Sequence, residues 1–140
     1  MTAATQAMPR VLERWKHHEF ILASGNKAWA GAAAGIDQST GKVEPMHNEA
    51  DLLYIGVFDE DVDATTNDRR VSVDLGMEIE VRRWANGGTA VAAADVGSLC
   101  NFLDDQTVTM DAGPVAGRVW DVDANLGVAV QKLDFSYEAP

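Results

Sequence analysis

The stretch LLYIGVFDEDVDA, residues 52–64, carries the pattern that decides the fold. Residues 52–58 are a continuous apolar run of strand length, rich in aromatic and branched side chains that pack well on a pleated surface. An acidic loop follows at once, with Asp59, Glu60, Asp61 and Asp63. A related stretch, AGRVWDVDA, occurs at residues 116–124. One unit, a strand that ends in an acidic corner, is therefore present twice.

Strand patterns continue on both sides of these stretches. Residues 70–75 (RVSVDL) and 127–133 (GVAVQKL) alternate between apolar and polar side chains, which is the period of a half-buried strand. In residues 77–84 (MEIEVRRW) the alternation predicts an apolar face of Met77, Ile79 and Val81. Turn-forming segments separate the strands: STGK (39–42), TTND (65–68), ANGG (85–88), LDDQ (103–106) and DAGP (111–114). Short strands divided by such turns indicate an all-β sandwich or barrel.

The repeat extends beyond the acidic corners. GKVEPM (41–46) precedes the first and QTVTMD (106–111) the second, and an alternating strand follows each. Two copies are too few for a solenoid. We therefore predict an all-β fold, a single β-sandwich or barrel-like domain of jelly-roll or β-tulip type, built from two similar β-units over residues 28–140. An N-terminal arm, residues 1–27, precedes it; its best helix candidate is residues 8–18, with an extended arm as the alternative.

Charge is distributed unevenly along the chain, whose net charge is −11. Residues 1–30 have four basic and two acidic side chains, net +2, and the remaining residues have seven basic and twenty acidic ones, net −13. An acidic body repels phosphate backbones, which argues against nucleic acid as a partner. A basic, aromatic arm on such a body suggests a protein contact. The candidate interface residues are Arg10, Arg14, Trp15, Lys16, Phe20 and Trp29.

Membrane and export signals are not expected. No apolar run approaches the roughly 20 residues that a membrane helix needs, and the first twenty residues lack the basic start and apolar middle of a signal peptide. We therefore expect no membrane partner.

The spacing of residues in the acidic loops does not match that of an EF-hand calcium site. A calcium loop of the EF-hand type needs glycine at position 6 and glutamate at position 12. Counting from Asp59 these positions are Ala64 and Arg70, and counting from Asp121 they are Leu126 and Lys132. We therefore predict no metal site, and interpret the carboxylates as turn formers and surface charge.

Catalytic motifs are equally absent from the sequence. It contains neither a GxSxG nucleophile elbow nor a glycine-rich phosphate loop. The single cysteine, Cys100, lies in a strand pattern, where it is expected to be a small buried hydrophobe. The chain is therefore predicted not to be an enzyme and to need no cofactor.

The two-unit pattern resembles the capsid decoration (cement) proteins of tailed bacteriophages. The resemblance rests on short Ala-, Gly- and Val-rich units and covers roughly residues 30–133. Its matching pieces are Ala94 to Val96, Asp105 to Thr109, Ala116 to Val122 and Gly127 to Leu133, and in the first unit Thr40 to Val43, Ile55 to Phe58 and Val71 to Gly76. The N-terminal 25 residues have no counterpart in that pattern, and the VFDEDVDA loop is more acidic than is usual there.

The resemblance implies a non-enzymatic virion protein on the outer capsid surface, assembled in the host cytoplasm. Its partners would be the major capsid protein and further copies of itself, as a dimer or trimer, and it would stabilise the expanded head. Two alternatives remain open at this point. One is a structural subunit of the phage tail or of the head–tail junction. The other is a calcium-dependent binding module that uses the acidic loops.

Overall fold

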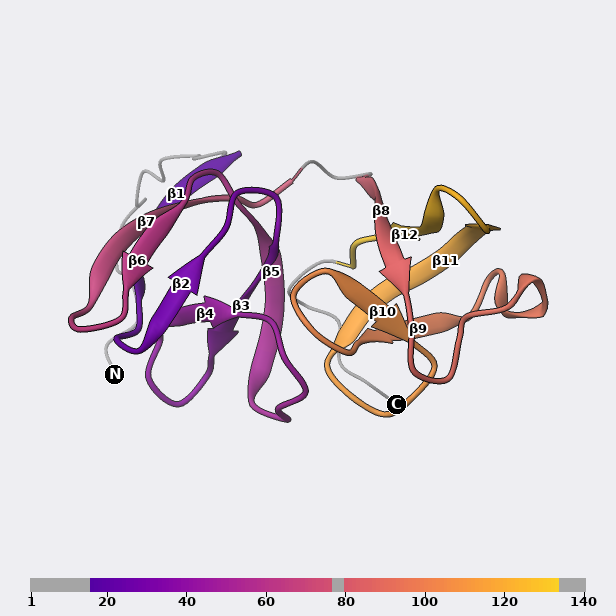
Figure 1. Ribbon diagram of the computed structural model, residues 1–140, viewed down its shortest axis with the longest axis horizontal. Helices are drawn as coiled ribbons and strands as arrows, with labels where there is room; N and C mark the ends of the chain where they lie inside the picture. Colours follow the sequence, from indigo (N-terminus) through magenta and orange to yellow (C-terminus); the bar gives the residue numbers. More distant parts are fainter. Residues whose placement is uncertain (1–15, 77–79, 134–140) are drawn as a thin grey trace, which may run out of the picture.

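The computed structural model describes residues 16–76 and 80–133, which form two closed five-stranded β-barrels side by side (Figure 1). The first barrel contains β1 (His17–Leu22), β3 (Ala33–Asp37), β4 (Val43–Pro45), β5 (Leu52–Phe58) and β7 (Arg69–Asp74). Two further strands, β2 (Asn26–Ala28) and β6 (Val62–Ala64), pair with each other in a separate two-stranded sheet.

The second barrel contains β8 (Val81–Asn86), β9 (Leu99–Phe102), β10 (Thr107–Thr109), β11 (Val115–Asp123) and β12 (Gly127–Gln131). The short 3-10 helix η1 (Ala93–Asp95) connects β8 to β9. The predicted all-β, barrel-like fold is therefore confirmed. Within the described ranges, no helix is long and apolar enough to cross a membrane.

Both barrels have the same topology. In chain order, the strands of each barrel are arranged first, third, second, fourth, fifth, and the fifth closes on the first. The first and third strands run parallel, as β1 with β4 and β8 with β10, and every other neighbouring pair is antiparallel. The repeat read in the sequence is therefore a repeat of barrels, in which GKVEPM and QTVTMD supply the third strand.

A glycine occupies the same place in the fourth strand of each barrel. Gly56 in β5 and Gly117 in β11 both follow a register shift, and both have positive φ, 158° and 150°. A Cβ atom at Gly56 would lie 2.0 Å from the carbonyl oxygen of Asp74, and one at Gly117 would lie 2.0 Å from that of Gln131. Only a residue without a side chain permits the fourth strand to approach the fifth so closely.

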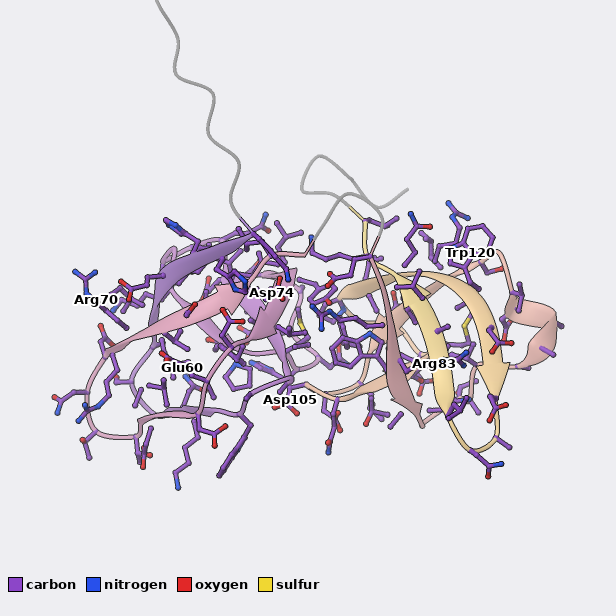
Figure 2. The ribbon with its side chains drawn as sticks, turned by 90° about the horizontal axis from the view of Figure 1, so that it is seen from above. Glu60, Arg70, Asp74, Arg83, Asp105 and Trp120 are labelled. Atoms are coloured by element: carbon purple, nitrogen blue, oxygen red, sulfur yellow. The ribbon has the colours of Figure 1, made fainter. Side chains whose placement is uncertain are left out.

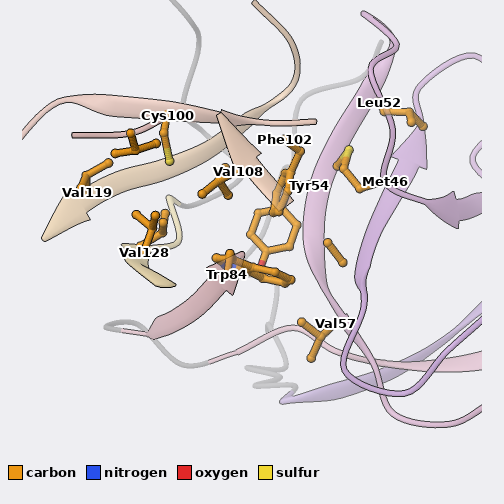
Figure 3. Close-up of a cluster of buried hydrophobic side chains, with 14 residues drawn as sticks. Met46, Leu52, Tyr54, Val57, Trp84, Cys100, Phe102, Val108, Val119 and Val128 are labelled. Carbon is orange, nitrogen blue, oxygen red and sulfur yellow. The ribbon is translucent and has the colours of Figure 1, made fainter. Parts of the chain in front are cut away.

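The hydrophobic cores of the two barrels are organised differently. A cluster that includes Leu22, Ile55 and Phe58 fills the first barrel. A larger cluster fills the second barrel and continues into the outward-facing side of β5, where Leu52, Tyr54 and Val57 belong to it (Figure 3). Since β5 buries both of its faces, it reads in the sequence as a continuous apolar run rather than an alternating one.

Aromatic rings join the two barrels. Tyr54 of β5 meets Trp84 of β8 and Phe102 of β9 in edge-to-face contacts, with ring centroids 6.2 and 4.8 Å apart (Figure 3). The same two rings of the second barrel contact each other at 5.1 Å. Edge-to-face pairs at these separations add to the free energy of apolar burial. The Tyr54 ring thus completes the core of the second barrel.

Polar contacts surround this aromatic junction. The guanidinium of Arg82 in β8 pairs with the Asp74 carboxylate of β7 at 3.4 Å and also with Glu80. The Ala33 amide of β3 donates a 2.7 Å hydrogen bond to the Asp105 carbonyl, which lies in the β9–β10 loop. The barrels are therefore held together by apolar burial, an ion pair and a backbone hydrogen bond.

The structure corrects two predictions about organisation. Residues 1–15 of the predicted arm lie outside the described residues, but residues 17–27 are not an arm. They form β1, paired with β7 along its whole length from His17 to Leu22, and most of β2. The body, predicted to begin at residue 28, therefore begins with β1 at His17, and its two similar β-units are two closed barrels that share a hydrophobic cluster.

The predicted apolar face of residues 77–84 is also wrong where it is described. Val81 is half exposed, and Trp84, on the opposite side of the strand, is buried. Met77 and Ile79 lie outside the described residues. The side of β8 that packs into the core is therefore the one that carries Trp84, because Trp84 lies at the junction with the first barrel.

Candidate interaction surface

The acidic loop after β5 is a folded corner rather than a free cluster of charge. Asp59 accepts hydrogen bonds from Ser72 at 2.6 Å and from His17 at 2.8 Å. Asp61 accepts a 2.8 Å bond from the Ala30 amide, and Asp63 accepts bonds from the amide and hydroxyl of Thr65. These carboxylates therefore tie β1, the β2–β3 turn and the β6–β7 turn together, as turn-forming residues do.

The pKa values follow from these contacts. Partial burial opposes ionisation of Asp59, but hydrogen bonds from Ser72 and His17 outweigh it and lower its pKa. Hydrogen bonds from Thr65 lower the pKa of Asp63. At the corresponding corner of the second barrel, the amides of Leu126 and Asn125 lower the pKa of Asp123. The interpretation of both acidic stretches as turn formers is confirmed at these positions.

Both acidic stretches lie near the end of the fourth strand of their barrel, but they differ in conformation. In the first barrel, Val62–Ala64 leaves the barrel as β6 and pairs with β2. In the second barrel, the equivalent VDA sequence ends β11, and Asp123 closes a short turn into β12. The corner of the first barrel is therefore an added surface, next to Trp29.

Trp29 lies exposed on this corner, with 57% of its surface accessible. A backbone hydrogen bond from Ala32 to the Trp29 carbonyl, 3.0 Å long, closes the turn between β2 and β3. A shallow groove beside the indole is lined by Lys27, Asp61 and Asp63, among others. Trp29 thus offers an apolar ring with charged groups around it, the composition of a protein-binding anchor.

Trp120 is the second exposed tryptophan, with 50% of its surface accessible (Figure 2). A register shift in β11 inserts it as an extra residue between Val119, which is buried, and Asp121. Its indole N–H donates a 2.7 Å hydrogen bond to the Gln131 side chain. A bulge turns a strand residue outward, and the hydrogen bond then holds the exposed ring in one orientation.

The outer face around Trp120 has an apolar centre and a charged edge. Val81 lies opposite Gln131 across the β8–β12 ladder and is 49% exposed. Two residues further along the strands, Ala129 of β12 is buried and has Arg83 of β8 on one side and Asp121 of β11 on the other. The Arg83 guanidinium pairs with the Asp121 carboxylate at 2.8 Å. We call Val81, Arg83, Trp120, Asp121 and Gln131 the Trp120 face.

The predicted interface residues are distributed as follows. Arg10, Arg14 and Trp15 lie outside the described residues. Lys16 pairs with Asp74 at 3.8 Å, and Phe20 packs against the core of its own barrel. Of the predicted aromatic residues that the structure describes, Trp29 is exposed and Phe20 is half-buried.

Sequence reasoning missed Trp120 as an interface candidate. Its place in a strand pattern predicts packing on a core or sheet face, and nothing local marks the bulge that turns it outward. Only the comparison with the first unit offers a signal, because one more residue separates Gly117 from Trp120 than separates Gly56 from Phe58.

Cys100 and the cluster around His17 remain to be considered as chemical sites. Cys100 is fully buried in β9, and burial raises the pKa of its thiol to about 12, so it remains a protonated, packed side chain. His17 approaches Asp59 and Asp74, but Asp74 is already paired with Lys16 and Arg82. Those cations oppose a bound metal ion there.

Searches against known protein families, curated protein sequences and solved structures each returned no match.

Proposed function

We propose that this protein is a non-enzymatic structural protein of a tailed bacteriophage that binds the outer capsid surface and holds neighbouring major capsid protein subunits together. The observation that carries the proposal is a joined pair of barrels in which each barrel displays an exposed tryptophan, Trp29 on the first and Trp120 on the second. The resemblance of residues 30–133 to decoration proteins gives the partner class. A cement protein must contact two subunits at once, and two anchors on one body meet that need.

The energetics favour such an arrangement. Exposed tryptophans at the centre of an interface often dominate its binding free energy, and each becomes fully desolvated on binding. Two contacts on one body make the second binding event intramolecular, which raises the overall affinity without any new contact. The shared hydrophobic cluster and the Arg82–Asp74 pair hold the barrels in one relative orientation, so little entropy is lost when both anchors engage.

Co-sedimentation with undecorated shells tests the proposal. Expanded shells and unexpanded precursors, assembled from the major capsid protein of the same phage, are incubated with the intact chain. We expect saturable binding to expanded shells at a fixed ratio to capsid subunits. Binding to neither shell would contradict the proposal and would favour a tail or head–tail joining role, which copy number per particle then tests.

Two tryptophan variants test the anchors themselves. Trp29→Ala and Trp120→Ala should each weaken shell binding by more than tenfold, since truncation of a hot-spot side chain costs about 2 kcal/mol or more. Leu126→Ala is the matched control, because Leu126 is a 65% exposed apolar residue in the turn between β11 and β12. If both tryptophan variants bind like the control, the two-anchor arrangement is wrong even where the shell is bound.

The predicted basic arm has a separate test. Removing residues 1–27 would delete β1 and unfold the first barrel, because β1 pairs with β7 over six residues. The truncation must therefore stop at residue 15, which removes Arg10, Arg14 and Trp15 and leaves both barrels intact. We expect weaker shell binding, and unchanged occupancy would eliminate the arm as a contact.

A further inference from the structure

We propose that Glu44, His47 and Glu49 form a binding site for one divalent transition-metal ion, with zinc as the best fit. The Nε2 atom of His47 lies 2.5 Å from a carboxylate oxygen of Glu44 and 3.3 Å from one of Glu49. One ligand atom from each residue lies within 4.8 Å of the others. The three residues come from a six-residue segment at the end of β4 and the start of the β4–β5 connection.

The fold holds this segment in place. Glu44 is in β4, and only 17% of its side chain is exposed. The Met46 side chain is buried in the shared cluster, and its amide donates to the Ala33 carbonyl at 2.9 Å. The Glu49 amide donates to the His47 carbonyl at 2.8 Å, which folds the chain back so that Glu49 faces the imidazole. A site ordered before binding loses little conformational entropy when the ion arrives.

The contacts around His47 are of the kind that a metal ion can bridge. Two carboxylates converge on a single ring nitrogen, and that nitrogen carries at most one hydrogen to donate. A divalent cation at this point would satisfy all three ligand atoms together. The cluster of His17, Asp59 and Asp74 differs, because Lys16 and Arg82 already neutralise Asp74 there.

The donor set identifies the class of ion. Calcium and magnesium prefer oxygen ligands alone, whereas an imidazole with carboxylates suits zinc and related transition metals. Bonds of about 2.0–2.2 Å place tetrahedral ligands about 3.3 Å apart, and the Glu49–His47 separation already has that value. The Glu44 contact must open by less than about 1 Å to reach the same spacing. His47 and Glu49 are about half exposed, which leaves room for a water molecule as fourth ligand.

Metal binding at this site should also order residues at the junction of the two barrels. Asn48 lies inside the metal-binding segment, and its side chain faces the β10–β11 loop so closely that a Cβ at Gly113 would lie 3.2 Å from the Asn48 oxygen. An ion that fixes the β4–β5 connection therefore orders a segment in contact with both barrels. A ligand that binds only the folded protein raises its melting temperature.

Zinc titration of the full, tag-free chain by calorimetry, with thermal melts in parallel, tests the site. We expect one equivalent of zinc bound and a higher Tm with zinc, and no Tm change with calcium at the same concentration. Cobalt bound in place of zinc should give the strong visible absorption of a four-coordinate ion.

Two histidine variants localise the binding. His47→Asn should weaken zinc binding by more than the roughly 10- to 100-fold that loss of an outer-shell partner costs. His17→Asn, in the other histidine–carboxylate cluster, is the matched control and should bind as the wild type does. The proposal is overturned if the wild type binds no zinc, if His47→Asn retains wild-type affinity, or if His17→Asn loses binding equally. The outcome does not depend on capsid binding.

Discussion

The first barrel closes around a hydrophobic cluster of its own, whereas the second completes its core with side chains from the first. The strand that makes the difference is the fourth of each barrel. In β5 the outward residues Tyr54 and Val57 are buried against the second barrel. In β11 the outward residues include Arg118 and Trp120, which face solvent.

This difference shows how a duplicated unit acquires two roles. Topology, the close-approach glycines and the inward-facing valines are the same in both barrels, because each closed barrel needs them. The outer face of the fourth strand is not needed for closure, so its side chains are free to differ. In the first barrel that face binds the second barrel, and in the second it displays Trp120 (Figure 2).

The largest expected effect breaks the dependence of the second barrel on the first. Tyr54→Ala removes a buried ring that contacts Trp84 and Phe102 and should cost about 3–5 kcal/mol of unfolding free energy. Hydrogen exchange should accelerate in β12 before it does in β7, because the lost contacts belong to the second barrel's core. Tyr54→Phe, which keeps the ring, is the control. Equal loss of protection in both barrels would contradict the asymmetry.

A second pair of variants tests the equivalence of the barrels. Gly56→Ala and Gly117→Ala each place a Cβ against a backbone carbonyl, and each should cost about 3 kcal/mol or more from clash and backbone strain together. Gly25→Ala is the control, since its φ is +92° but nothing lies within 4 Å of its Cβ position, so only strain of about 1–2 kcal/mol is expected. Urea denaturation measures all three. If one of the two fourth-strand glycines tolerates alanine, the barrels do not share this constraint.

The smallest effects concern the loop between the second and third strands. In the first barrel, hydrogen bonds from the Ser39 side chain and amide lower the pKa of Asp37 below its usual 3.8. In the second, burial against the first barrel and the neighbouring Asp104 raise the pKa of Asp105 above 3.8. The same connection thus holds one carboxylate that favours ionisation on folding and one that resists it.

Substitution by asparagine should therefore act in opposite directions at these two positions. Asp37→Asn should lower the Tm at pH 7, and the difference should disappear as the pH falls through the lowered pKa of Asp37, where the wild-type carboxyl is protonated as well.

Asp105→Asn should stabilise at pH 7 by no more than about 0.5 kcal/mol, because solvent screens a half-buried group. That gain should vanish below pH 3.8, where Asp105 is protonated in both states. Thermal melts taken stepwise from pH 7 into the acid range measure both, and shifts of the same sign at pH 7 would contradict this interpretation.

Local pattern was sufficient for much of the fold. Residues 52–58, 70–75 and 127–133 contain β5, most of β7 and β12, and the repeat marks two similar units. These features depend on which side chains alternate along a strand, and that information is contained within a few residues. The turn-forming carboxylates were predictable for the same reason, since Asp63 and Asp123 each bind an amide two residues onward.

Long-range pairing decided what the sequence could not. HHEFIL in β1 carries no clear strand alternation, and it becomes a strand because it pairs with its neighbour β7 to close the barrel and because Leu22 pairs with Val43 of β4. The outward turn of Trp120 depends on a bulge against β12, and the approach of His47 to Glu44 and Glu49 depends on how the β4–β5 connection folds back.

The sequence by itself determined the strand composition, the duplication and the turn chemistry, because these arise from residues close together in the chain. Tertiary structure alone decided that each unit closes into its own barrel, that the first barrel supplies part of the second one's core, and which tryptophans remain exposed. The physical reason is that closure and burial join residues from distant strands, and a local pattern shows that a side chain is apolar without showing what will cover it.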